Sequence, residues 1–167
     1  MVRFIKDKSF YYIAGTGHRP SKCGKSYEEY FNGELENQKN MCISYIAEKK
    51  MSNIKIISGM AQGWDTALAL AAIELDLPLI AAIPCVNQSS RWTEKSKEIY
   101  DFIVNEADEK YVLADRYSVL CMMNRNAWMV DRCDEVLAYW DGKNKGGTYN
   151  CVTYAKKKKV TIVNLMT

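Results

Sequence analysis

Glycine-rich segments with neighbouring polar residues are the parts of this sequence best suited to bind an anion. One such segment, WDGKNKGGTYNCVTYA from Trp140 to Ala155, lies between a strand-like run and a helix-like run. Its adjacent glycines, Gly146 and Gly147, let successive backbone amides converge on an anion, and Thr148 adds a hydroxyl. The alternative is an ordinary loop that ends in a helix cap. The P-loop pattern G-x-x-x-x-G-K-[ST] is missing, which disfavours a nucleoside triphosphatase.

A second segment, GTGHRP, runs from Gly15 to Pro20. Gly17 lets the backbone approach a ligand closely. His18 can donate or accept a hydrogen bond, and Arg19 can contact a phosphate through two N–H groups. The alternative is a plain strand-to-loop turn with Arg19 in a surface ion pair. The third glycine of the dinucleotide-binding fingerprint is absent.

A third segment, SGMAQGWDTALALA, places Gly59, Gln62 and Gly63 around the start of a predicted helix. Amides in the first turn of a helix can bind an anion. Asp65 can accept hydrogen bonds from ribose hydroxyls. Its alternative role, which Thr66 shares, is to cap the helix or offset the helix dipole.

The fourth segment, CMMNRNAWMVDRCDEVLAYW, carries Arg125 and Asn126 side by side on a predicted helix. Asp131 lies further along the same helix, which leads to an apolar strand. A guanidinium at this place can bind phosphate in two-pronged fashion. The alternative for Arg125 is an exposed helix position with no ligand.

Six short apolar runs alternate with longer stretches of helical spacing. The four segments described above overlap or adjoin these elements. The apolar runs are 11–17, 54–59, 78–84, 110–114, 134–140 and 160–165, and the helical stretches are 26–49, 62–75, 92–106 and 119–132. This pattern predicts a single Rossmann-like, doubly wound α/β domain over residues 1–167, with a mainly parallel sheet and helices on both faces. Ligands of such domains lie at the carboxyl ends of the strands.

Composition narrows the classes of function. Apolar residues make up 48% of the chain, and 23 basic residues against 20 acidic ones give a net charge of +3, which alone does not indicate nucleic-acid binding. The basic block Lys156 to Lys159 is interpreted as a solvated helix end. The only histidine is His18, and no ligand spacing predicts a metal site. No apolar run is long enough to span a membrane.

Cysteine usage and the first residues predict a cytoplasmic protein. None of the cysteines forms a C-x-x-C pair, and MVRFIKDKSF is too short and too charged for a signal peptide. We therefore expect reduced, mostly buried thiols. The cysteines are Cys23, Cys42, Cys85, Cys121, Cys133 and Cys151.

Taken together, the four segments resemble the YpsA-like branch of the SLOG superfamily. They occur in the same order, and the similarity extends from about Ile13 to about Val163. SLOG members share a Rossmann-like fold and include the "lonely guy" nucleoside 5′-monophosphate phosphoribohydrolases and the DNA-processing protein A family. The resemblance implies a bacterial or phage protein with a pocket for a nucleotide or a nucleotide-derived ligand.

The resemblance also bears on catalysis. In the phosphoribohydrolases, a helix with Met-x-x-Arg-Lys precedes the loop Pro-Gly-Gly-x-Gly-Thr-x-x-Glu. Arg125 matches the arginine and Asn126 the lysine, Gly147 and Thr148 match the Gly-Thr pair, and the glutamate falls on Cys151. The proline and one glycine of the loop also differ. A neutral thiol replaces a carboxylate poorly in glycoside cleavage. The resemblance therefore implies that the anion-binding loop is kept while the catalytic carboxylate is missing.

We therefore expect a binding or sensing module for a phosphate-bearing, nucleotide-related small molecule, with no metal or other cofactor. The expected ligand-binding residues are Gly17, His18, Arg19, Gly59, Gln62, Gly63, Asp65, Thr66, Arg125, Asn126, Gly146, Gly147 and Thr148. The first alternative is a phosphoribohydrolase-like N-glycosidase, with Arg125, Asp65 and Asp131 as candidate catalytic residues. Asp141 is a further aspartate that would have to reach the pocket.

Two expectations concern macromolecular partners. DNA-processing protein A relatives bind single-stranded DNA, which makes nucleic-acid binding the second alternative. The near-neutral charge and the core-compatible spacing of most aromatic residues disfavour it. A homodimer through an aromatic stripe of Tyr27, Tyr30 and Phe31 is a further hypothesis, and packing of this stripe on the sheet is its alternative.

Overall fold

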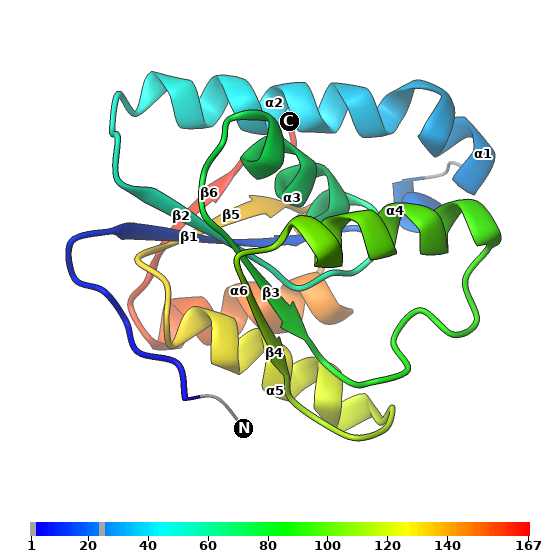
Figure 1. Ribbon diagram of the computed structural model, residues 1–167. Helices are drawn as coiled ribbons and strands as arrows, with labels where there is room; N and C mark the ends of the chain where they lie inside the picture. The colour runs from blue at the N-terminus through cyan, green and yellow to red at the C-terminus, as the bar shows by residue number, and fades with distance from the viewer. Residues whose placement is uncertain (1–2, 24–25) are drawn as a thin grey trace.

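Six parallel strands form one sheet in the computed structural model, which describes residues 3–23 and 26–167 (Figure 1). The strands are β1 (Tyr11–Gly17), β2 (Ile54–Ser58), β3 (Leu79–Ile83), β4 (Glu109–Val112), β5 (Glu135–Tyr139) and β6 (Thr161–Asn164). Their order in the sheet is β4-β3-β2-β1-β5-β6. The direction of winding therefore reverses between β1 and β5, and this is the point at which doubly wound sheets bind ligands.

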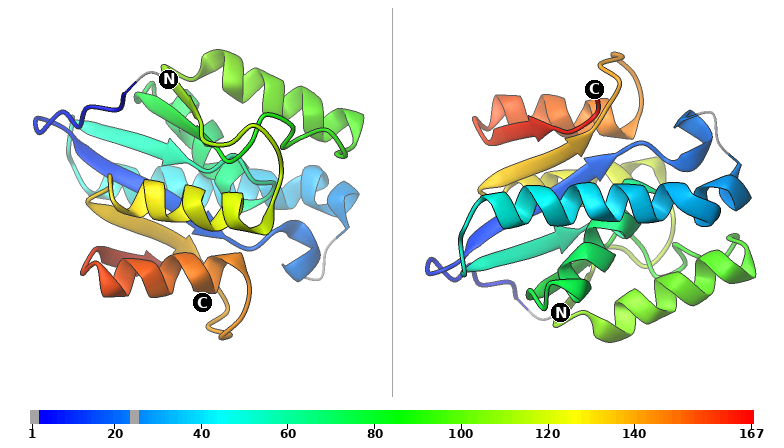
Figure 2. Two further views of the ribbon diagram at one scale, coloured as in Figure 1. Left: turned by 90° about the horizontal axis from the view of Figure 1, so that it is seen from below. Right: turned by 90° about the horizontal axis from the view of Figure 1, so that it is seen from above.

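Helices cover both faces of this sheet (Figure 2). They are α1 (Tyr27–Glu29), α2 (Leu35–Glu48), α3 (Trp64–Glu74), α4 (Glu94–Glu106), α5 (Val119–Val130) and α6 (Gly147–Lys157). Helices α2, α3 and α4 lie on one face, and α5 and α6 lie on the other. The predicted Rossmann-like α/β fold is confirmed, including the expected parallel pairing of β2 with β3.

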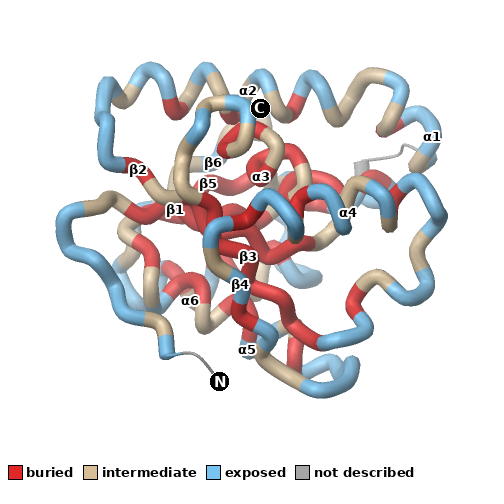
Figure 3. The backbone as a smooth tube through the Cα atoms, in the orientation of Figure 1, coloured by how far each residue is buried: buried red, intermediate tan, exposed pale blue. Residues whose placement is uncertain are grey.

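The core consists of two apolar clusters, one on each face of the sheet. Along β1, Ile13 belongs to the cluster under α2 and α3, whereas Tyr12 and Ala14 belong to the cluster under α5 and α6. Burial on both faces explains why the strands are continuous apolar runs instead of alternating ones. The tube in Figure 3 shows the central strands β1, β2, β3 and β5 as mostly buried, whereas the edge strands β4 and β6 are largely exposed or half-buried.

The long helix expected over 26–49 is interrupted. A capping box between Ser26 and Glu29 starts α1, in which Ser26 accepts from the Glu29 amide and Glu29 accepts from the Ser26 amide. A π-turn over Tyr30–Glu34 follows, and Gly33 has the non-helical angles φ 164° and ψ −40°. Glycine is a poor helix former, so the helix yields at this residue before α2 continues it.

The aromatic stripe of the dimer hypothesis lies on this interrupted helix. Tyr30 is buried and donates a hydrogen bond from its hydroxyl to Gln38 Oε1 over 2.9 Å. Tyr27 and Phe31 are half-buried and line a narrow crevice against α3 and α4. Most of the stripe therefore contacts this chain itself, and self-association stays a prediction.

Two further sequence expectations can be compared with the described residues. Cys42, Cys85, Cys121, Cys133 and Cys151 are free and buried, and the side chain of Cys23 lies outside the described part. Among the helices of the described residues, none combines the length and apolar character needed to cross a membrane.

Candidate functional site

A cavity of about 360 Å³ opens at the carboxyl edge of the sheet, beside the ends of β1 and β5. Its walls come from the loop after β1, the start of α3, the middle of α5 and the start of α6. The lining residues are Gly17, His18, Arg19, Ser21, Lys22, Ala61, Asp65, Met122, Arg125, Asn126, Gly147 and Thr148. The cavity thus coincides with the reversal of the strand order.

Arg125 is the buried cation of this cavity, with only 7% of its surface exposed. Its Nε donates to Asn126 Oδ1 over 2.9 Å, and its Nη1 donates to the Gly59 carbonyl. Among the described residues, Nη2 has no hydrogen-bond partner. A guanidinium held in place by two bonds with one nitrogen left over is suited to receive an anion from the cavity.

Asn126 connects this guanidinium to the start of α6. Its Nδ2 lies 3.3 Å from both the Gly147 carbonyl and Asn150 Oδ1. Helix α6 begins after Gly146, whose φ of 92° favours glycine, and no side chain caps the helix. The first-turn amides of α6 are therefore left for water or for a ligand.

Asp65, at the start of α3, is the buried carboxylate of the cavity and is 5% exposed. Its Oδ2 accepts from the Ala61 amide over 3.3 Å. Burial raises the pKa of Asp65, while the nearby guanidiniums of Arg125 and Arg19 act in the opposite direction. No ion pair within 4.0 Å joins Asp65 to another described residue, so the carboxylate is not neutralised by direct contact.

Gly59 lets these two charged groups approach each other. A Cβ built on Gly59 would lie 2.6 Å from Arg125 Nη1 and 2.8 Å from Asp65 Oδ2. Any larger residue would push one or both side chains away from their present places. The glycine at the end of β2 is thus needed for the charge arrangement, although it does not itself line the cavity.

His18 fixes the loop that follows β1. Its Nε2 lies 3.0 Å from both the backbone amide and Oδ1 of Asp141, just after β5. The backbone amide of Lys143 and then His18 lower the pKa of Asp141. The Nδ1 of His18 is buried without a hydrogen-bond partner in the described chain. His18 therefore links the two strands at the reversal point and leaves one ring nitrogen unused.

Most of the residues predicted to bind ligand do come together. Eight of the thirteen line the cavity: Gly17, His18, Arg19, Asp65, Arg125, Asn126, Gly147 and Thr148. Gly146 precedes them as the residue before α6, and Gly59 lies behind the two charged side chains. These placements make the cavity the site to which the binding prediction refers.

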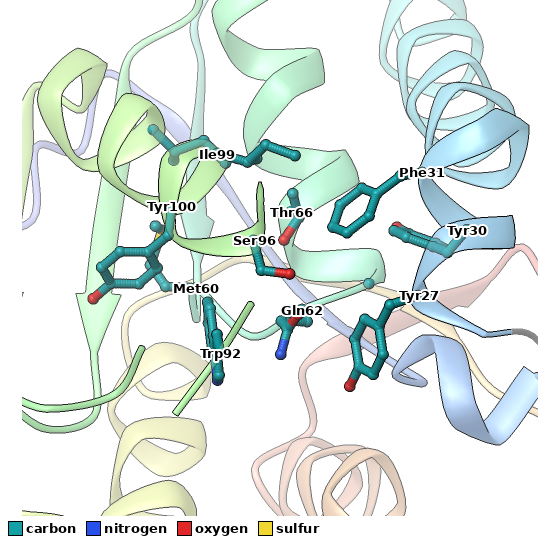
Figure 4. A pocket seen from close by; sticks show the side chains of 12 residues that line it. Tyr27, Tyr30, Phe31, Met60, Gln62, Thr66, Trp92, Ser96, Ile99 and Tyr100 are labelled. Carbon is teal, nitrogen blue, oxygen red and sulfur yellow. The ribbon is translucent and has the colours of Figure 1, made fainter. Parts of the chain in front are cut away.

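Three more of the predicted residues lie in a different hollow. Gln62, Gly63 and Thr66 instead line the crevice of about 10 Å³ between α1, α3 and α4 (Figure 4). The Thr66 hydroxyl donates to the Ala61 carbonyl over 3.0 Å. A Cβ at Gly63 would lie 2.7 Å from the His18 carbonyl, so this glycine serves close packing of two loops.

Asp131, a candidate catalytic residue, also lies away from the cavity. It follows the last residue of α5 and accepts from the Tyr154 hydroxyl over 2.9 Å. Lys158 approaches it at 3.7 Å. Since α5 leads back to the start of β5, Asp131 belongs to the opposite end of the molecule.

Cys151, at the position of the hydrolase glutamate, is buried in the apolar cluster under α5 and α6. Burial raises the pKa of its thiol to about 11, so the thiol is neutral at physiological pH. It does not line the cavity. Gly147 and Thr148, about one helical turn earlier on α6, do line the cavity, so residue 151 lies next to the site.

Sequence reasoning missed four of the lining residues, namely Ser21, Lys22, Ala61 and Met122. Met122 precedes Arg125 by about one helical turn, so helical spacing alone could have placed it on the same face. Lys22 lies in the short helical turn Pro20–Cys23, and its Nζ lies against Gly146. That contact joins two distant loops, and no local pattern indicates it.

This chain is similar to some known proteins in sequence and to others in fold. YoqJ, an SPbeta prophage-derived protein of Bacillus subtilis strain 168, is 31% identical over 125 residues, which are 65% of this chain and 72% of that protein. DNA processing protein A of Streptococcus pneumoniae superposes with a TM-score of 0.64 at 19% identity, over 92% of this chain and 49% of that one. This chain thus spans about half the length of that neighbour.

A second solved neighbour is DNA processing protein A of Helicobacter pylori, whose structure concerns single-stranded DNA binding by that protein. Its TM-score is 0.61 at 18% identity, over 95% of this chain and 68% of that one. Likeness at this level of identity establishes the fold alone. The YpsA family model, described as the YspA SLOG family, matches residues 42–165. This match covers most of the chain, and the chain belongs to the YspA SLOG family.

Proposed function

We propose that the protein is a binding or sensing module that holds a nucleotide or nucleotide-derived ligand by its phosphate in the cavity between β1 and β5. The observation that carries this proposal is the position of Arg125. Its guanidinium is fixed through Nε and Nη1, its Nη2 is unused by the described residues, and the uncapped start of α6 lies beside it. A guanidinium and helical amides are the groups that bind phosphate.

Asp65 supplies the second half of the recognition. A buried carboxylate without an ion-pair partner in the described chain is costly unless hydrogen-bond donors reach it. The hydroxyls of a ribose are such donors. A phosphate on Arg125 and a sugar on Asp65 would place a nucleoside phosphate across the cavity, with Lys22 and Arg19 at the rim.

Hydrolysis of the ligand is not part of the proposal. Cleavage of an N-glycosidic bond needs a placed carboxylate, and Cys151 offers a buried, neutral thiol instead. Asp65 is the only aspartate or glutamate that lines the cavity among the described residues. We assign it to sugar binding, which leaves no second carboxylate to act as the acid–base partner.

Calorimetric titration with the four ribonucleoside 5′-monophosphates and with nucleotide sugars tests binding. Arg125→Met keeps the length of the side chain and removes the charge, and it should weaken binding about tenfold to a hundredfold. Arg125→Lys should recover only part of the loss because it lacks the planar fork. Lys157→Met, which removes one charge from the exposed far end of α6, is the matched control. Absence of binding across the panel at millimolar ligand would refute the proposal.

Incubation with the same nucleotides, followed by chromatography for free base, tests the absence of hydrolysis. We expect no base release from the wild type. Cys151→Glu restores the family carboxylate next to the cavity, and hydrolysis gained by this variant would mean that only the carboxylate was missing. Base release by the wild type that disappears in Asp65→Asn would instead establish the N-glycosidase alternative.

Single-stranded nucleic acid is the rival ligand. The observation that favours it is the exposed basic block Lys156 to Lys159 near Tyr154, whose ring centroid lies 5.5 Å from Lys158 Nζ. This block lies at the opposite end of α6 from the cavity. A salt-sensitive gel shift that is abolished by neutralising the four lysines would rank this function first. A shift that persists in that variant would leave the block without a role.

A further inference from the structure

A second cavity of about 340 Å³ adjoins the first. Arg19 and Met122 line both, so the two hollows share a wall and form one groove. The other lining residues come from the loop after β3 and the loop after β4: Asn87, Gln88, Ser90, Arg91, Trp92 and Tyr117. Each hollow is at the lower end of the range of about 300–1,000 Å³ that is usual for small-molecule sites.

The lining of the second cavity is cationic and aromatic. Arg19 and Arg91 supply two guanidiniums, and no aspartate or glutamate is among the lining residues. Neither arginine forms an ion pair within 4.0 Å in the described part of the chain. Two exposed guanidiniums without a counter-charge attract an anion, and they recognise phosphate in particular.

Two aromatic rings give this cavity surfaces on which a base can stack. Trp92 is held edge-on against Tyr100, with ring centroids 5.3 Å apart and an interplanar angle of 89° (Figure 4). Tyr117 is 58% exposed, and its backbone amide donates to Asn87 Oδ1 over 3.2 Å, which ties the two loops together. Stacking on aromatic rings tolerates any base because every base has a π-face.

Gln88 joins the second cavity to the phosphate site of the first. It is 8% exposed, and its Nε2 donates to the Gly59 carbonyl over 3.3 Å. The same carbonyl accepts from Arg125 Nη1. The Oε1 of Gln88 is buried without a partner in the described chain. One lining residue of each hollow, Arg125 in the first and Gln88 in the second, therefore donates to the same carbonyl behind them.

We propose that the second cavity is a subsite for a second nucleoside unit, so that the ligand is a dinucleotide and not a mononucleotide. This inference rests on the proposed function of the first cavity. The first unit lies on Arg125 and Asp65, the linking phosphate lies at Arg19 on the shared wall, and the second base lies against Trp92 and Tyr117. Arg91 then contacts a phosphate or sugar hydroxyl of the second unit.

Two linkages share this chemistry, and the experiment distinguishes them. Isothermal titration compares 5′-AMP, 5′-phosphorylated adenylyl dinucleotide joined by a phosphodiester, and a dinucleoside pyrophosphate, with guanine, cytosine and uracil counterparts in parallel. We expect one of the dinucleotide forms to bind about tenfold or more tightly than its mononucleotide, since a stacked base contributes that much. The form that gains identifies the linkage.

Variants then locate the gain. Arg91→Ala and Tyr117→Ala should each lower dinucleotide affinity about tenfold and leave mononucleotide affinity unchanged. Arg116→Ala removes an exposed guanidinium next to Tyr117 that lines neither cavity. Phe102→Ala removes an exposed ring on α4. These two controls should leave both affinities unchanged.

Three outcomes would overturn the inference. Mononucleotide binding with no gain from either dinucleotide would refute the second subsite and leave the proposed function standing. Affinity that keeps rising from two to four to eight nucleotides would show that the groove serves single-stranded nucleic acid. Failure of every mononucleotide and dinucleotide to bind would refute the proposed function together with this inference.

Discussion

Two buried carboxylates lie at opposite edges of the same sheet and differ in how completely the protein satisfies them. At the amino edge, Glu135 is 1% exposed and accepts from the hydroxyls of Tyr11 at 2.9 Å and Tyr45 at 2.6 Å. It also contacts Lys49 Nζ at 2.6 Å. At the carboxyl edge, Asp65 has one amide donor and no contact ion pair in the described chain, beside an open cavity.

This difference distinguishes buried charges that stabilise the fold from buried charges that are available to a ligand. Around Glu135 every group has a partner, and Lys49 also lies 5.1 Å from the ring centroid of Tyr11. Burial, followed by the hydrogen bond to Glu135, raises the pKa of Tyr11 to about 12, so this hydroxyl keeps its proton through the physiological range. Asp65 and Arg125 leave hydrogen-bonding capacity unused. Unsatisfied buried charges beside a cavity are typical of binding sites, whereas saturated ones hold the fold.

The largest effect should follow from breaking the fully hydrogen-bonded cluster around Glu135. Glu135→Gln leaves Lys49 without its counter-ion and weakens both tyrosine hydrogen bonds, so the free energy of unfolding should fall by about 3 kcal/mol. Urea denaturation measures this fall, and nucleotide affinity at a temperature where the variant is folded should not change. A stability within about 0.5 kcal/mol of the wild type would mean that the cluster does not stabilise the fold.

Disturbing Asp65 and Arg125, whose hydrogen-bonding capacity is partly unused, should affect binding more than stability. In Gly59→Ala the added methyl meets the flexible ends of Arg125 and Asp65, which can move aside at little cost in folding. Nucleotide affinity should fall about tenfold while the free energy of unfolding drops by only about 1 kcal/mol. Calorimetry and urea denaturation measure the two quantities.

The matched control for this substitution is Gly33→Ala, because a Cβ at Gly33 meets no atom within 4 Å. It lies on the interrupted helix and should leave nucleotide affinity unchanged. If Gly59→Ala instead bound nucleotide normally, the approach of Arg125 and Asp65 would not matter for the ligand.

The acidic pH range should reveal the uncompensated charge of Asp65. Its pKa in the folded protein is raised above the ordinary value of 3.8, so the folded state holds this proton more tightly than the unfolded state. Stability from this group is fully present below pH 3.8 and is lost as the pH rises through the folded pKa. Asp65→Asn cannot titrate and should lack this part of the loss.

Urea denaturation at a series of pH values compares the two proteins. The difference in free energy of unfolding between Asp65→Asn and the wild type should increase in favour of the variant as the pH rises. Parallel curves over the whole acidic range would contradict the prediction. A bound nucleotide should reduce the difference, since its ribose hydroxyls donate more strongly to the charged carboxylate of the wild type than to the neutral amide of the variant.

The smallest effect should come from an exposed carboxylate that forms a single surface ion pair. Glu94 pairs with Lys97 at 3.4 Å on the surface of α4, and its side chain is 87% exposed. Glu94→Gln should change the free energy of unfolding by less than about 1 kcal/mol, because water and salt screen exposed pairs. If Glu94→Gln lowered the free energy of unfolding as much as Glu135→Gln, burial would not determine how strongly a carboxylate stabilises this fold.

The sheet could be predicted from the sequence because its four central strands are buried on both faces. The run YYIAGTG matches β1 at both ends, and the other strands agree to within two residues at each end. The interruption at Gly33 was not predicted, since the apolar spacing on either side of it is helical. A single glycine in a long helix gives no warning of where the helix will yield.

The predicted site residues lie together where local pattern and sheet geometry agree. Gly17 ends β1, and Asp65 and Thr148 lie in the first turns of the helices that follow β2 and β5, so the parallel sheet brings all three to one edge. Thr66 is only one residue beyond Asp65, yet the helix turns it into the crevice on the α4 side. Gln88, Arg91 and Trp92 lie in a loop whose path depends on tertiary contacts, and local sequence carries little information about such paths.

The pairing of β1 with β5 determines when the cavity can form. His18 and Asp141, which meet at its edge, are separated by 123 positions in the chain. A ribosome adds about 5–20 residues per second, so the first loop emerges well before the segment that closes over it. A cellular ligand therefore cannot guide the early steps of folding. It can stabilise only the finished molecule, by mass action, and cells rich in that ligand should contain a longer-lived protein.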